Sequence, residues 1–187
     1  VAWSGNHVHV AERLVAGRWL GGGEYLLPGE IVLGLGESYG SPWVYGSYGV
    51  GLDDLAHRFH DHLRALPGHP RSPRPVTMNS WEAVHFDHDI DELGRLVDEA
   101  AALGVERFVL DDGWFGSRRD ATRGLGDWTV SRDLYPDGLH PLVNRVTGHG
   151  MQFGLWFEPE MVNPDSDLAR AHPDWILQVP GRMPPLS

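Results

Sequence analysis

One stretch, V-E-R-F-V-L-D-D-G-W at Val105–Trp114, constrains the fold more than any other part of the sequence. Its apolar run, Phe108–Leu110, is typical of a short strand buried on both faces of a parallel sheet. Two carboxylates, Asp111 and Asp112, follow directly, and unpaired charge is too costly to bury in an apolar core. Because ligands bind at the carboxyl ends of strands in parallel sheets and barrels, the stretch predicts a strand that ends in a binding site.

From residue 76 onward the sequence alternates predicted strands and helices. Strands are expected at 76–83, 105–110 and 151–157, and helices are expected to begin at Asp89 and near Pro141. The first helix has apolar residues at helical spacing between an Asp N-cap and a C′ glycine. Three β-α units predict a parallel sheet with right-handed crossovers. All three strands end in polar or aromatic clusters on the same side, so we expect an α/β fold that forms part of a (β/α)₈ barrel.

The sequence before residue 76 has a different character. Alternating apolar residues and glycine-rich turns predict β-structure over residues 1 to 50, including a short strand at Ile31–Leu33. An apolar stripe at Leu52–Leu66 predicts one amphipathic helix. Residues 67–75, P-G-H-P-R-S-P-R-P, suit neither a helix nor a central strand and predict an extended linker. We therefore expect one domain at residues 1–66, a linker at 67–75 and a second domain at 76–187.

Composition argues against several classes of partner and site. The net charge of −11 disfavours nucleic acid or an anionic membrane surface as a partner. The sequence has no cysteine, which excludes a disulfide framework and a thiolate zinc site. No apolar run approaches the length of a membrane span. The chain begins and ends in mid-pattern, so we expect it to be an internal piece of a longer protein.

Carboxylates close to tryptophans are the main chemical feature of the sequence. The acids are Glu82, Asp111, Asp112, Asp127, Glu158 and Glu160, and the tryptophans are Trp81, Trp114, Trp128 and Trp156. Paired acids flanked by tryptophan, without a nucleophile elbow or a phosphate loop, indicate a carbohydrate ligand. A solvated Asp-Gly turn is the simpler interpretation of residues 111–113, but Trp114 suits a sugar-stacking wall better. Spacing alone suggests Asp112 and Glu158 as an acid/base pair.

The segment His85–Asp89, H-F-D-H-D, is a candidate metal site because histidine and aspartate are metal ligands. However, alternation aims neighbouring side chains in different directions, and acids also suit the first turn of the helix that follows. We interpret the segment as a loop and predict neither a metal nor a cofactor. The alternative is a metal-dependent barrel hydrolase that uses Asp111 and His85, whose activity chelators would abolish.

Four motifs occur in order along the second half of the chain. They are N-S-W-E-A at 79–83, L-D-D-G-W-F-G at 110–116, L-G-D-W at 125–128 and L-W-F-E-P-E-M at 155–161, with H-P-D-W downstream at 172–175. Together they resemble bacterial α-galactosidases of glycoside hydrolase family 36, the melibiases, over the chain from about Trp19 to its end. The resemblance implies the end of an N-terminal β-sandwich followed by the first half of a (β/α)₈ TIM barrel. It also implies retaining removal of terminal α-galactosyl groups from oligosaccharides such as melibiose and raffinose.

The resemblance assigns binding roles, and no covalent role, to this chain. In that family an aspartate in a Lys-Trp-Asp motif is the nucleophile and a later aspartate is the acid/base. The present sequence contains no lysine, so we expect no catalytic residue here and no activity of this piece alone. Asp111 and Asp112 match the acids that contact the galactose hydroxyls at C4 and C6, and Trp81 and Trp156 match tryptophans that line the pocket. Carboxylates at fixed positions can distinguish an axial from an equatorial hydroxyl.

Several alternatives stay open on the sequence alone. A galactosyltransferase of the raffinose-synthase kind or an α-N-acetylgalactosaminidase would share this part of the barrel, and a non-catalytic sugar-binding protein could keep the pocket. Asp127 and Trp128 could build either the pocket or a subunit contact. We expect the parent protein to be a cytoplasmic bacterial homo-oligomer that binds an α-galactoside oligosaccharide, with neither nucleic acid nor a membrane as its partner.

Overall fold

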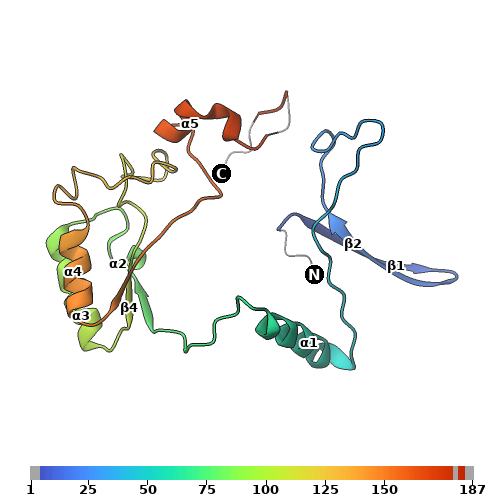
Figure 1. The fold of residues 1–187 in the computed structure, drawn as a ribbon, viewed down its shortest axis with the longest axis horizontal. Helices are drawn as coiled ribbons and strands as arrows, with labels where there is room; N and C mark the ends of the chain where they lie inside the picture. The colour runs from blue at the N-terminus through green and yellow to red at the C-terminus, as the bar shows by residue number, and fades with distance from the viewer. Residues whose placement is uncertain (1–4, 179–180, 184–187) are drawn as a thin grey trace. The chain divides into compact units, whose positions relative to one another are not determined.

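The computed structural model describes residues 5–178 and 181–183, which fall into two compact units (Figure 1). One unit comprises residues 1–71 and 178–187, and the other comprises residues 72–177. The outermost parts of both expected domains, residues 1–4, 179–180 and 184–187, lie outside the described residues. None of the described helices combines the length and the apolar character needed to cross a membrane.

The first unit contains an antiparallel hairpin and one helix. Strand β1 (His7–Leu14) pairs along its whole length with β2 (Gly17–Glu24). Helix α1 (Gly51–Ala65) confirms the expected amphipathic helix, and its apolar stripe is partly buried. The strand expected at Ile31–Leu33 was predicted wrongly. A short apolar run becomes a strand only when a second strand supplies hydrogen bonds, and this segment belongs to neither described sheet.

The second unit contains a parallel three-stranded sheet. Its strands lie in the order β3 (Thr77–Asn79), β4 (Arg107–Leu110) and β5 (Gln152–Leu155), so β4 is central. Helix α3 (Ile90–Ala102) connects β3 to β4, and α4 (His140–Gly148) connects β4 to β5. The β-α alternation expected from the sequence is therefore confirmed.

The first predicted strand, residues 76–83, is shorter than expected and ends at Asn79. The side-chain oxygen of Asn79 accepts a hydrogen bond from the Trp81 backbone nitrogen at 2.8 Å, and helix α2 (Trp81–Val84) begins there. Asparagine favours such local side-chain-to-backbone bonds, which compete with a strand ladder. The strand prediction was wrong at this end because the spacing of apolar residues gives no information about such side-chain hydrogen bonds.

Local signals at the ends of α3 are confirmed. The Asp89 carboxylate accepts hydrogen bonds from the backbone nitrogens of Asp91 and Glu92, at 3.0 and 2.9 Å. After the helix, Gly104 has φ +82°, a conformation that glycine adopts without the steric cost of a Cβ. These two caps fix where the chain enters and leaves the helix that precedes β4.

The core of the second unit lies between the central strand and the two longer helices. Phe108 and Leu110 of β4 are fully buried, and so are Val97 of α3 and Val146 of α4. The opposite face of β4, which carries Val109, is only half-buried, so the expectation that both faces are buried was wrong. Because strand side chains alternate between faces, two acids directly after β4 leave the strand in different directions.

Candidate functional site

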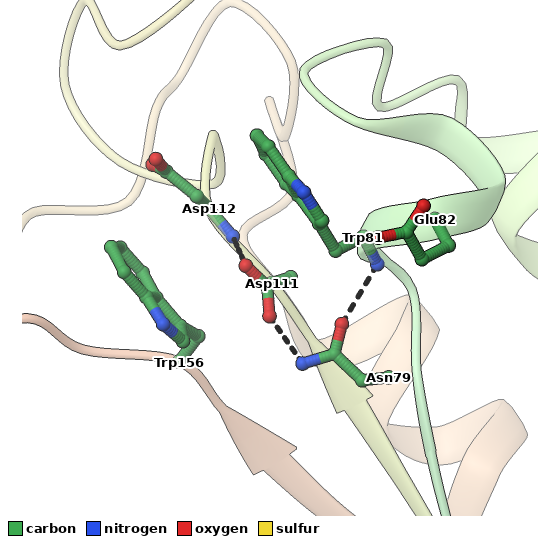
Figure 2. A pocket seen from close by; sticks show the side chains of 6 residues that line it. All are labelled: Asn79, Trp81, Glu82, Asp111, Asp112 and Trp156. Carbon is green, nitrogen blue, oxygen red and sulfur yellow. Dashed lines mark hydrogen bonds between the residues drawn. The ribbon is translucent and has the colours of Figure 1, made fainter. Parts of the chain in front are cut away.

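A pocket of about 460 Å³ opens where β3, β4 and β5 end (Figure 2). It is lined by Asn79, Trp81, Glu82, Asp111, Asp112 and Trp156. The structure thus brings together all four residues that the sequence proposes for binding. Trp81 follows β3, Asp111 and Asp112 follow β4, and Trp156 follows β5. Glu82, one of the acids noted near a tryptophan, also lines the pocket, whereas Asn79 of the same 79–83 motif had no expected role.

The pocket walls include two tryptophans. In Figure 2 the indole rings of Trp81 and Trp156 lie on either side of the Asp111 carboxylate. Trp156 directly follows β5. Its backbone nitrogen donates a hydrogen bond to the Leu110 carbonyl at 3.0 Å, and its own carbonyl accepts one from Trp114 Nε1 at 3.0 Å. Two aromatic faces flanking an acid can hold the apolar face of a ring while the acid binds its polar substituents.

Trp114 does not form the sugar-stacking wall that its position after the acids suggests. Its exposed fraction is only 2%, and its ring packs edge-on against Phe115 and Phe157, with centroid distances of 5.1 and 5.2 Å. The prediction was wrong because Gly113 reverses the chain, with φ +113°, and so directs the next residue into the core. The Trp114 indole instead donates its hydrogen bond to the Trp156 carbonyl, and so helps to hold the backbone of that pocket residue.

The Asp111 carboxylate is held by neutral donors. One oxygen, Oδ2, accepts from the Asn79 side-chain amide, and the other accepts from the Asp112 backbone nitrogen at 2.7 Å. The Asp111 backbone nitrogen in turn donates to Ser80 Oγ at 3.0 Å. Both oxygens are therefore fixed in direction, and each keeps a lone pair for another donor.

The Asp112 carboxylate is held by a cation. Arg118 donates from Nε to Oδ1 at 3.0 Å and from Nη2 to Oδ2 at 2.7 Å, and the two side chains are only 5% and 7% exposed. The Asp-Gly turn suggested as a simpler interpretation does form at Gly113, but its acids are buried beside the pocket and are not solvated. Sequence reasoning missed Arg118, because nothing in a loop sequence marks which arginine is buried.

The alternative acid/base pair is not assembled. Asp112 is bound to Arg118, and Glu158 is absent from the residues that line the pocket. Spacing along two neighbouring strands places both residues near the same sheet edge, but it does not determine where the side chains point after the strands end.

The members of the His85–Asp89 segment have separate partners. His85 packs edge-on against Trp81, with a centroid distance of 5.0 Å, and Asp89 caps α3. His88 is buried, and its Nδ1 lies 2.8 Å from the Tyr135 hydroxyl. Burial lowers the pKa of His88 and raises that of Tyr135. Within the part of the chain that the structure describes, no group of three or more His, Cys, Asp or Glu side chains could hold a metal ion.

Asp127, whose role the sequence left open, caps a helix. Its carboxylate oxygens accept from the backbone nitrogens of Asp167 and Leu168, both at 3.0 Å, at the start of α5 (Asp167–Ala171). Asp127 therefore ties the long loop after β4 to the segment after β5, and it does not line the pocket. Ser166 adds a second cap to the same turn by accepting from the Ala169 nitrogen.

We expect Asp127→Ala to destabilise the full-length protein that contains this chain by about 0.5–2 kcal/mol, because two helix N–H groups lose their acceptor. The measurement is the shift of the thermal unfolding midpoint. Asp137→Ala, which removes an exposed acid from the same loop, is the matched control and should change stability by less than about 0.5 kcal/mol. Equal shifts for the two variants would contradict the capping role.

Comparison with known proteins supports the motifs at this site. The sequence profile described as Melibiase matches residues 38–187. The chain belongs to the melibiase family. An alpha-galactosidase from Escherichia coli is 44% identical over 189 residues, which cover 99% of this chain and 27% of that protein.

Solved structures of the melibiase family agree with this membership. The family 36 α-galactosidase AgaB from Geobacillus stearothermophilus superposes with a TM-score of 0.80 and 40% identity, covering 97% of this chain and 26% of that one. A variant of AgaA from the same organism, in complex with raffinose, gives a TM-score of 0.71 and 39% identity over 89% of this chain and 26% of that one. The resemblance stated from the motifs is thus confirmed, and the chain spans about a quarter of the length of these relatives.

Proposed function

We propose that this chain forms the galactose-binding part of a retaining α-galactosidase, which removes terminal α-galactosyl residues from oligosaccharides such as melibiose and raffinose. The observation that carries the proposal is the pocket in which Asp111 and Asp112 lie with Trp81 and Trp156 at the ends of parallel strands. The relatives' names support it, and so does the raffinose complex of the AgaA variant.

In this proposal the two acids recognise galactose through its hydroxyls. Each carboxylate oxygen already has a protein donor but keeps acceptor capacity, so the hydroxyls at C4 and C6 can donate to oxygens whose positions are fixed in advance. A charge-assisted hydrogen bond of this kind contributes about 1.5–3 kcal/mol. The tryptophans cover the apolar faces of the sugar and exclude water.

The covalent chemistry is assigned to residues outside this chain. Retaining hydrolysis needs two carboxyl groups about 5–5.5 Å apart, on either side of the glycosidic bond, one as nucleophile and the other as acid and then base. The proposed nucleophile motif, Lys-Trp-Asp, requires a lysine, and this chain has none. The chain therefore supplies the walls that orient the sugar, and orientation alone can lower a barrier substantially.

The proposal includes an architecture for the parent protein. Residues 1–66 would be the end of an N-terminal β-sandwich with its connecting helix, 67–75 a linker, and 76–187 the first three β-α units of a (β/α)₈ barrel. The parallel order β3-β4-β5 and the superposition on AgaB over nearly the whole chain support this arrangement. A cytoplasmic location and homo-oligomeric assembly of the parent protein belong to the same proposal.

The test is turnover of 4-nitrophenyl α-galactoside by the full-length protein, with EDTA in the assay. We expect nitrophenol release from this compound but not from its β-anomer, and none by the 187-residue chain alone, which lacks the proposed nucleophile motif. Activity that EDTA abolishes and a divalent ion restores would favour the metal-dependent alternative. Activity on 4-nitrophenyl α-N-acetylgalactosaminide alone, or galactosyl transfer to an acceptor without hydrolysis, would favour the corresponding alternatives.

A further inference from the structure

Arg118 is the most enclosed charged group beside the pocket. Its guanidinium binds the Asp112 carboxylate in a bidentate manner, through Nε and Nη2. The centroid of the Phe86 ring lies 5.4 Å from Cζ of Arg118. A buried cation is stable only when charge and hydrogen bonds compensate it, and here the compensating charge is an acid that lines the pocket.

The remaining donor of Arg118 joins separate segments of the chain. Nη1 donates to Asn163 Oδ1 at 2.9 Å and to the Arg123 carbonyl at 3.1 Å. Asn163 lies after β5, and its Oδ1 also accepts from the Leu125 backbone nitrogen at 3.0 Å. The guanidinium is thus held by the loop after β4 and by the segment after β5 at once, so its own position is fixed.

We propose that Arg118 is a positioning residue that holds the Asp112 carboxylate in the orientation needed to accept a hydrogen bond from a sugar hydroxyl. This inference rests on the proposed function. A bidentate arginine fixes both the position and the plane of a carboxylate, whereas lysine is a point charge that leaves the plane free. Arg118 also supplies the countercharge for a carboxylate that has a second carboxylate, Asp111, beside it in the sequence.

The two acids therefore depend on different groups. Asp111 is held by an amide and a backbone nitrogen, and neither donor comes from Arg118. Removal of Arg118 should consequently act on the sugar through Asp112 only. Sugar binding can therefore distinguish positioning of Asp112 from a general loosening of the loop. Loosening would weaken sugar binding whether or not Asp112 is present.

The test uses Arg118→Gln, Arg118→Lys, Asp112→Asn and the double variant Asp112→Asn/Arg118→Gln in the full-length protein. We expect Arg118→Gln to lower kcat/KM for 4-nitrophenyl α-galactoside by about 10- to 100-fold and to raise the inhibition constant of free galactose by a similar factor. Arg118→Lys should recover part of both losses. The double variant should have a kcat/KM within about twofold of that of Asp112→Asn. The effects of two residues that act through one contact are not additive.

Arg95→Gln is the matched control, since that side chain is 63% exposed on α3 and pairs only with Glu92, one turn away on the same helix. It should leave kcat/KM and the galactose inhibition constant unchanged. If the Arg118→Gln and Asp112→Asn losses multiply, or if Arg118→Gln lowers the melting temperature while the inhibition constant stays at the wild-type value, the positioning role is wrong. Absence of turnover by the wild-type protein would instead refute the proposed function itself.

Discussion

Asp112→Asn in the full-length protein should lower kcat/KM for an α-galactoside by about 10- to 150-fold, the equivalent of one charge-assisted hydrogen bond. The proposed role of Asp112 is to bind a sugar hydroxyl, and a binding contact stabilises the transition state as well as the bound substrate. The amide also leaves the buried Arg118 without its countercharge, so the variant should also unfold at a lower temperature. The covalent step itself should survive, because the proposed nucleophile is untouched.

Azide separates this role from nucleophilic attack. When a true nucleophile is cut back to a small residue, azide can enter the space and give a product of inverted configuration. We therefore expect Asp112→Gly, assayed with α-galactosyl fluoride and azide, to remain impaired and to form no β-galactosyl azide. Rescue by azide with that product would identify Asp112 as the nucleophile. The aspartate of the proposed Lys-Trp-Asp motif, replaced by glycine, is the positive control.

Features set by a few neighbouring residues could be predicted from the sequence. The central strand, the helix between Asp89 and Gly104, and the position of the acids after β4 all follow from short-range apolar patterns and caps. The gathering of Trp81, Asp111, Asp112 and Trp156 also follows, because parallel strands place their carboxyl ends at one edge.

Features that depend on distant partners could not be predicted. Arg118 and Asn163 are separated by 45 positions, and the sequence gives no sign that one binds the other. Trp114 looked like a pocket wall because its neighbours are acids, but the turn at Gly113 sends it into the core. Asp127 resembled a site residue because Trp128 follows it, although its carboxylate caps a helix 40 positions away.

The acids can be pre-organised only if the strand that carries them is rigid, and Phe108 is the largest fully buried side chain of that strand. Its Cα lies between those of Met78 and Phe153 in the sheet register, so its ring packs at the centre of the covered face.

We expect Phe108→Ala to cost about 3–5 kcal/mol, because the change removes buried apolar surface and leaves a cavity that the close-packed neighbours cannot fill. Domains are typically stable by only about 5–15 kcal/mol, so the variant should melt at a clearly lower temperature and become sensitive to trypsin within residues 76–177. Phe108→Leu, which keeps most of the volume, is the matched control and should cost less than about 1.5 kcal/mol. If both variants melt like the wild-type protein, β4 is not the element that fixes the acids, and the rigidity of the site must come from the hydrogen bonds that hold the two carboxylates.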